Sequence, residues 1–76
     1  MKTEKKDILM FIDERSKEGF GTTKKAIYKA FTKYSKDVID KCIKELRYEN
    51  EIMLSPLVNE STGMFAGRGY VTENVF

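Results

Sequence analysis

The chain has 76 residues, with 14 basic side chains, 12 acidic side chains and a formal net charge of +2, so it is long enough for one small domain over residues 1–76, and its charge alone does not identify a partner. It contains one cysteine and no histidine, which excludes an internal disulfide, a His/Cys zinc site and the Ser-His or Cys-His nucleophile pairs. We therefore expect a protein that is not an enzyme and that uses no metal and no cofactor.

No part of the sequence is typical of a membrane span or a signal peptide. The apolar runs fall far short of the ~20 residues that a helix needs to cross a bilayer. The N-terminal residues MKTEKKD lead into an amphipathic segment. Because a single thiol is also typical of a reducing compartment, we expect a cytoplasmic protein without membrane contact.

The first predicted element is a helix over about residues 3–18. Thr3 is a suitable N-cap, and acidic residues occupy the first turn. The apolar residues that recur at helical spacing are Ile8, Leu9, Phe11 and Ile12. We expect Gly19 to end this helix and Phe20 to enter the core.

A second helix is predicted over about residues 23–33, with Thr22 or Thr23 as its N-cap. The residues expected on its buried face are Ala26, Ile27, Ala30, Phe31 and Tyr34. Because small residues one turn apart let another helix approach closely, Ala26 and Ala30 predict tight packing on this face.

A third helix is predicted over about residues 35–49, with Ser35 as its N-cap. Its expected buried stripe consists of Val38, Ile39, Cys42, Ile43 and Leu46. Asn50 suits the left-handed backbone position that ends a helix, because a short polar side chain tolerates that region. The position of Cys42 on the stripe indicates an inert core thiol.

Beyond residue 50 the apolar pattern changes to that of strands. We expect a β-hairpin with strands at about residues 52–58 and 69–74, joined by a glycine-rich loop at 59–68. Pro56 limits the first strand to an edge or bulged position, because proline cannot donate to a ladder.

This order of elements resembles the winged-helix branch of the helix-turn-helix proteins, and the resemblance covers nearly the whole chain. It is carried by FTKYS at 31–35, by IKEL at 43–46 with NEI at 50–52, and by GRGYV at 67–71. In this family a leucine near the end of the third helix usually packs on an apolar residue past the turn, and Leu46 and Ile52 match that spacing. The usual glycine of that turn is missing here. The fold class implied is α+β.

The resemblance also implies a mechanism. Helix 35–49 would enter the major groove of double-stranded DNA, the start of helix 23–33 would contact phosphates, and the 59–68 wing would lie on the backbone or in the minor groove. The charge distribution agrees with this, because residues 22–47 hold eight bases and three acids, whereas the rest of the chain holds six bases and nine acids.

The predicted DNA contacts lie on these three regions. Basic and hydroxyl side chains bind phosphates, lysine and arginine also read guanine, and aspartate accepts from the amino group of cytosine. The predicted set is Thr23, Lys24, Lys25, Tyr28, Ser35, Lys36, Asp37, Asp40, Lys41, Lys44 and Arg68. Arg68 is the single base of the last 29 residues, and the glycines beside it favour a close approach to DNA.

Each feature also has a structural interpretation. The pairs Asp37–Lys41 and Asp40–Lys44 have the i,i+4 spacing that stabilises any exposed helix, and both acids repel phosphates. Thr23 and the lysines after it are equally compatible with a capped surface helix. The glycines around residue 68 are also explained by turn geometry alone.

The function predicted is that of a sequence-specific double-stranded DNA-binding protein, a small transcription regulator acting as a homodimer. Candidate dimer contacts are the apolar residues Met10, Val75 and Phe76. The alternative is a winged-helix protein–protein interaction module, a recruiter or inhibitor of a larger complex, such as one encoded by a phage or plasmid. RNA binding through the same basic band is a third interpretation.

Overall fold

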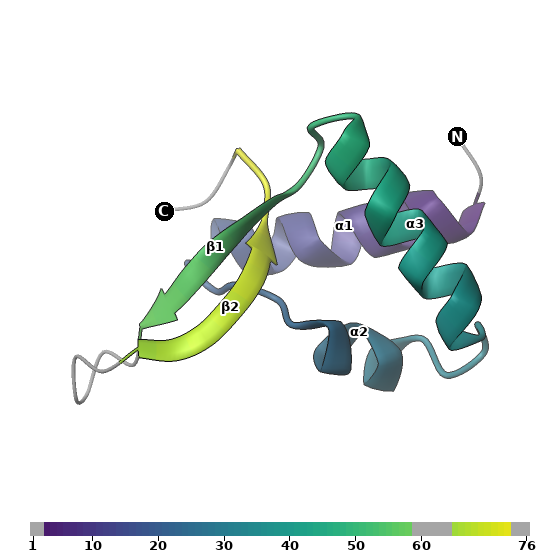
Figure 1. Ribbon diagram of the computed structural model, residues 1–76, viewed down its shortest axis with the longest axis horizontal. Coiled ribbons are helices and arrows are strands. Elements are labelled where there is room, and N and C mark those ends of the chain that lie inside the picture. The colour runs from purple at the N-terminus through teal and green to yellow at the C-terminus, as the bar shows by residue number, and fades with distance from the viewer. Residues whose placement is uncertain (1–2, 59–64, 74–76) are drawn as a thin grey trace.

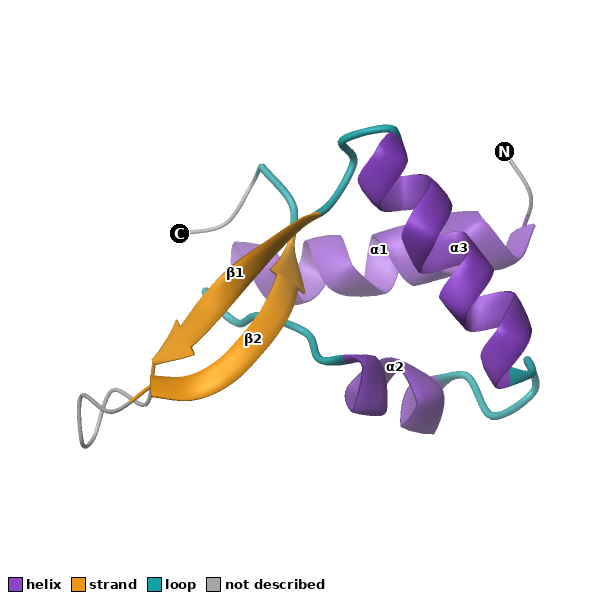
Figure 2. Ribbon diagram, viewed as in Figure 1, coloured by secondary structure: helices purple, strands orange, loops and turns teal. Residues whose placement is uncertain are grey.

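The structure is a computed structural model that describes residues 3–58 and 65–73. Its elements are α1 (Thr3–Lys17), α2 (Lys24–Ala30), α3 (Lys36–Tyr48), β1 (Met53–Val58) and β2 (Phe65–Val71). Three helices pack together, and a two-stranded antiparallel hairpin extends from them (Figures 1 and 2). The α+β prediction is confirmed, and the layout is consistent with a winged helix. No helix in the described ranges combines the length and the apolar content needed to cross a membrane.

The two long helices end in the same way. Gly19 follows α1 with a φ of 86°, and Asn50 follows α3 with a φ of 60°. In each case the left-handed residue donates its N–H to the carbonyl three residues earlier, and the next residue donates to the carbonyl five residues earlier, at 2.9–3.1 Å. This is the Schellman pattern, which satisfies the last carbonyls of a helix. Both predicted stops are confirmed.

Hydroxyl side chains cap the N-termini of α2 and α3. Thr23 Oγ1 accepts from the N–H of Ala26 at 3.1 Å, and Ser35 Oγ accepts from the N–H of Val38 at 3.2 Å. Thr22, the other candidate for the first of these caps, is fully buried instead. Both hydroxyls therefore satisfy backbone donors of their own helices.

The segment between α1 and α2 is attached to the hairpin, and the two run side by side in Figure 1. The N–H of Thr22 donates to the carbonyl of Tyr70 at 3.0 Å, and the N–H of Tyr70 donates to the carbonyl of Thr22 at 2.7 Å. Arg15 Nε donates to Thr22 Oγ1 at 3.0 Å. This bridge fixes β2 beside the start of α2, so that both elements contribute to one surface.

The core lies where the three helices meet the base of the hairpin. It is made of Ile8, Ile12, Ile27, Ile39, Cys42, Ile43, Leu46, Ile52 and Tyr70. Leu46 and Ile52, the pair expected from the resemblance, both belong to this cluster. The core is almost entirely aliphatic, which is typical of a small domain that relies on close packing.

Three core predictions are wrong. Phe20 is 56% exposed, and the Arg15 guanidinium lies 5.8 Å from its ring centroid. Ala30 is exposed because α2 ends there, three residues earlier than predicted. Val38 is 39% exposed, because it lies in the first turn of α3, beside the first residues of α1, where the two helices cover it only in part.

The hairpin also differs from its predicted bounds. The strands pair from Met53 opposite Val71 to Val58 opposite Phe65, with an irregularity between Leu57 and Val58. Because β2 begins at residue 65 and not at 69, Arg68 lies in the strand opposite Pro56. Residues 59–64, which hold most of the predicted wing loop, lie outside the described residues.

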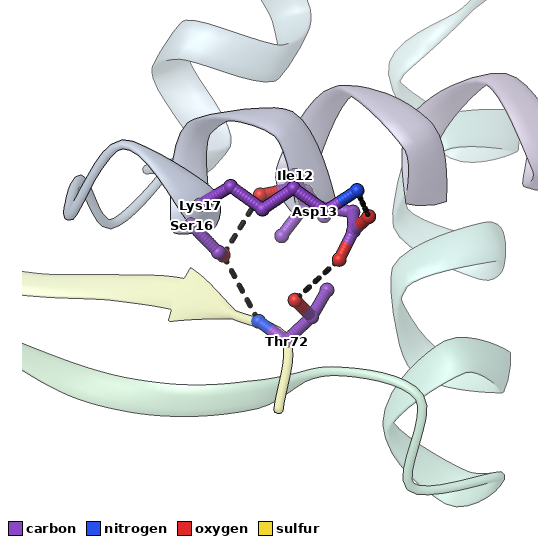
Figure 3. Close-up of polar contacts among 5 residues, drawn as sticks. All are labelled: Ile12, Asp13, Ser16, Lys17 and Thr72. Atoms are coloured by element: carbon purple, nitrogen blue, oxygen red, sulfur yellow. Dashed lines mark hydrogen bonds and ion pairs between the residues drawn. The ribbon is translucent and has the colours of Figure 1, made fainter. Parts of the chain in front are cut away.

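A network of polar contacts, the α1–β2 junction, joins the end of β2 to α1 (Figure 3). Ser16 Oγ donates to the carbonyl of Ile12 at 2.8 Å and accepts from the N–H of Thr72 at 3.0 Å. Thr72 Oγ1 donates to Asp13 Oδ1 at 2.7 Å, and Lys17 Nζ lies 3.2 Å from Asp13 Oδ2. Ser16 and Thr72 are buried, so the hydrogen bonds of these two residues satisfy polar groups that are shielded from water.

A buried lysine joins α1 to α3. Lys5 forms an ion pair with Glu49 and lies 3.8 Å from Glu45 Oε2. The hydrogen bond to Glu49 raises the pKa of the Lys5 ammonium above its ordinary value, against the opposing effect of burial. Lys5 therefore stays protonated at neutral pH and closes the α1–α3 contact.

Candidate nucleic-acid interface

A surface hollow of about 530 Å³, here called the basic depression, lies between α2, α3 and β2. It is lined by Lys24, Asp40, Ile43, Lys44, Arg47, Tyr48 and Tyr70. Lys24 comes from the start of α2, Tyr70 from β2, and the other residues from α3. Three elements therefore place their side chains on one surface, which the bridge between Thr22 and Tyr70 holds together.

The three basic side chains that line the basic depression are accessible to a ligand. Lys24, Lys44 and Arg47 are all exposed. No acid in the described part of the chain lies within ion-pair distance of any of them. Like charges this close to one another repel, and an anion entering the depression relieves that repulsion.

The acids of α3 are not paired as the structural interpretation supposed. Among the described residues, neither Asp37 with Lys41 nor Asp40 with Lys44 forms an ion pair. Asp40 instead accepts a hydrogen bond at Oδ1 from the hydroxyl of Tyr28 on α2. Helix-stabilising pairs therefore do not account for the charges on this face.

Tyr28 connects α2 to α3. Its side chain is half-buried and packs against the core, and the Lys36 ammonium lies 5.4 Å from its ring centroid. The hydrogen bond to Asp40, followed by burial, raises the pKa of the Tyr28 hydroxyl. Tyr28 therefore remains a donor to Asp40 at neutral pH, and it does not present a free hydroxyl to a ligand.

The structure separates the other predicted contacts of α2 and α3 from the basic depression. Thr23 and Ser35 use their hydroxyl oxygens as caps. Lys41 does not line the basic depression; it lines one hollow with Thr3 and Glu4 of α1, and a second hollow that it shares with Lys44 and Tyr48. The remaining members of the predicted set are exposed but do not line the basic depression; they are Lys25, Lys36 and Asp37.

The remaining predicted contacts are Arg68 and the candidate dimer residues. Arg68 belongs to β2, and its side chain lies outside the described residues. Of the candidate dimer contacts, Met10 is 51% exposed and lines a hollow between α1 and the chain that follows α3. Val75 and Phe76 lie outside the described residues.

Besides the core residue Ile43, three residues that line the basic depression are not in the predicted set of DNA contacts. Arg47 follows Lys44 by three residues on the polar face of α3, so helical spacing alone indicated it. Tyr48 is 88% exposed, and only its position next to Arg47 suggested a role. Tyr70 was predicted only as a residue of the second strand, and the strand pattern did not show that it would lie beside α3.

No group of three or more potential metal ligands is present among the described residues. In comparisons with known proteins, no family model, no curated protein and no solved structure matches this chain. The indications of function therefore come from the residues of the basic depression and from the layout of the fold.

Proposed function

We propose that this protein binds double-stranded DNA with sequence preference, as a small transcription regulator, and that the exposed face of α3 enters the major groove. The observation that carries the proposal is the basic depression, in which Lys24, Lys44 and Arg47 lie together without ion-pair partners among the described residues. Phosphate contacts supply most of the affinity in such complexes, and they come mainly from lysine and arginine.

Two features support DNA over a small anion. The cations belong to two separate helices on either side of a hollow of about 530 Å³, so they can contact phosphates that are separated along a backbone. Two of the three cations, Lys44 and Arg47, lie on the exposed face of α3, and an α-helix fits the major groove of B-form DNA. The layout consistent with a winged helix also supports this orientation.

The proposal is tested by titrating a labelled duplex of random sequence at about 50 mM and 200 mM salt. If three phosphates are contacted, the logarithm of the affinity falls with the logarithm of the salt concentration with a slope of about −2.7, because each contact releases nearly one counterion. Lys44→Ala reduces that slope by about 1. Lys6→Ala is the matched control, because Lys6 is an exposed lysine on α1 that does not line the basic depression, and we expect it to leave the slope unchanged.

Absence of duplex binding at the lower salt concentration overturns the proposal. It would favour an interaction with another protein, for which the exposed Tyr48 and Val38 on α3 are suitable anchors. Preference for single-stranded or double-stranded RNA in the same titration would favour the RNA interpretation.

Homodimerisation is part of the proposal, because one small module presents few base contacts and two half-sites supply both affinity and specificity. Met10 on α1 is the candidate contact within the described residues, with its side chain half-exposed. Light scattering over a range of protein concentrations tests the mass, and a constant monomer mass with and without duplex contradicts the paired half-sites.

A further inference from the structure

Among the described residues, Asp40 is the one acid that lines the basic depression. A carboxylate at this place repels the phosphates that Lys24, Lys44 and Arg47 attract. Its presence lowers the affinity for any nucleic acid unless the ligand presents a hydrogen-bond donor to it. Asp40 is therefore expected to contact a hydrogen-bond donor of the ligand, whereas its three basic neighbours are expected to contact phosphates.

The position of Asp40 is set by another helix. The Tyr28 hydroxyl donates to Oδ1, and Tyr28 itself is held by the core and lies under the Lys36 ammonium. Lys44, one turn along α3, does not form an ion pair with Asp40. The carboxylate is therefore fixed by a neutral donor that leaves its negative charge in place.

One oxygen of Asp40 remains available. In the described part of the chain the Tyr28 hydroxyl is the sole hydrogen-bond donor to this carboxylate, and the residue is exposed. A carboxylate has two oxygens and about four acceptor sites, so Oδ2 can accept from a ligand while Oδ1 stays bound to Tyr28.

The bases of DNA differ in what they offer to such an acceptor. In the major groove cytosine presents the N4 amino group, whereas guanine presents two acceptors and thymine an acceptor and a methyl group, so neither offers a donor to a carboxylate. Adenine presents the N6 amino group beside the N7 acceptor, so a carboxylate that approaches N6 also meets a lone pair. Cytosine is the base whose edge fits best.

We infer that Asp40, positioned by the Tyr28 hydroxyl, is a specificity-determining residue that selects a cytosine in the bound duplex. This inference rests on the proposed function. In it, Lys24, Lys44 and Arg47 bind the backbone and provide affinity, whereas Asp40 lowers general affinity and provides discrimination. Tyr28 acts as a positioning residue and does not touch the DNA.

The experiment begins with selection of preferred sites by the wild-type protein from a duplex pool with randomised positions. Binding is then measured on the selected duplex and on duplexes in which single C·G pairs are replaced by T·A. This replaces the cytosine amino group by the keto group of thymine, adds a methyl group, and moves the amino group of the pair to the purine. The wild-type protein is expected to lose about tenfold in affinity at one of these positions.

Three variants are compared on the same duplexes. With Asp40→Ala the penalty for that replacement falls to less than about twofold, because the acceptor is gone. With Tyr28→Phe, which keeps the ring and removes the hydroxyl, the penalty falls to about threefold, whereas a merely structural role would weaken binding to both duplexes equally. Glu14→Ala removes one exposed acid from α1 and leaves the tenfold penalty intact.

The outcomes separate the inference from the function on which it rests. Retention of the tenfold penalty by Asp40→Ala overturns the inference, and so does a selected site without any cytosine preference, while DNA binding stands in both cases. A wild-type protein that binds no duplex at low salt overturns both. Asp40→Ala is expected to fold, since the site is exposed and alanine is the best helix former, and Tyr28→Phe tests the same inference without any change in α3.

Discussion

The α1–β2 junction and the basic depression are both polar, and they differ in where their polar groups find partners. At the junction the groups of Ser16 and Thr72 bond to α1 or to each other, and both residues are buried. In the basic depression the cations face solvent without ion-pair partners among the described residues. Polar groups that bond to one another inside the protein stabilise the fold, whereas polar groups that face solvent without a partner are available to a ligand. The comparison predicts that substitutions at the two places affect different measurements.

The largest effect on stability is expected from Ser16→Ala. The substitution removes the two buried hydrogen bonds that Ser16 Oγ makes with the carbonyl of Ile12 and the N–H of Thr72, and loss of buried hydrogen bonds costs about 1–3 kcal/mol. Urea unfolding of the purified protein measures the loss. Duplex binding by the fraction that remains folded should not change.

Thr72→Ser is the control for the junction, because it keeps the hydroxyl that donates to Asp13 Oδ1. We expect it to cost less than Ser16→Ala. If Ser16→Ala and the wild type have the same free energy of unfolding, the α1–β2 junction does not stabilise the fold, and it does not differ from the basic depression in this respect.

A smaller loss is expected from Asn50→Ala at the end of α3. Residue 50 has a φ of 60°, and a side chain without a local polar partner disfavours this region by about 1 kcal/mol. Asn50→Gly should instead match or exceed the wild type in urea unfolding, because glycine adopts this backbone without steric cost. Equal losses for both variants would show that the side chain, and not the backbone angle, is what matters.

Stability should also fall at alkaline pH. The pKa values of three side chains are raised in the folded protein. A hydrogen bond to Glu49 raises the pKa of Lys5, and a hydrogen bond to Asp40 raises that of Tyr28. Burial is the main cause of the raised pKa of Tyr34. A group whose pKa is raised in the folded state stabilises the fold fully at pH values below its unfolded-state pKa, which is 10.5 for lysine and 10.0 for tyrosine. This contribution is lost as the pH rises through the folded-state pKa.

Urea unfolding at several pH values between about 8 and 11 measures this decline. Lys5→Gln and Tyr28→Phe should each make the decline less steep, because each removes one titrating group. A decline that is identical in both variants and in the wild type would show that these contacts do not respond to pH in the folded state.

The smallest effect on stability is expected from Lys44→Ala with Arg47→Ala. Both residues are exposed and lack ion-pair partners in the described ranges, so the free energy of unfolding should change by no more than about 0.5 kcal/mol. Duplex affinity at low salt should fall about tenfold or more. A clear loss of stability in this double variant would mean that the basic depression, like the junction, belongs to the scaffold.

Much of the fold followed from local chemistry. Ser35 and Asn50 delimit α3 as predicted, because a hydroxyl cap and a left-handed stop act on backbone groups a few residues away. The predictions for Phe20 and Val38 were wrong because burial depends on which other element covers a residue. Apolar spacing shows which face of a helix is buried, but it does not show how far along the helix the cover extends.

The candidate site was predicted in part. Lys24, Asp40 and Lys44 were expected as contacts and do line one hollow. Lys41 was expected with them but lines only the hollows on the α1 side of α3, one of which it shares with Lys44. On a helix, residues 40 and 41 are about 100° apart, so small differences in how α3 packs decide on which side a lysine lies.

By itself the sequence determined the ends of α1 and α3, most of the aliphatic core positions and the order of three helices and a hairpin, because caps, stops and apolar periodicity depend on neighbouring residues. The tertiary structure alone decided that Tyr28 donates to Asp40, that Thr22 pairs with Tyr70, and that Lys24 joins Lys44 and Arg47. These contacts join residues of separate elements. Their geometry depends on how the elements pack, and no local pattern encodes that arrangement.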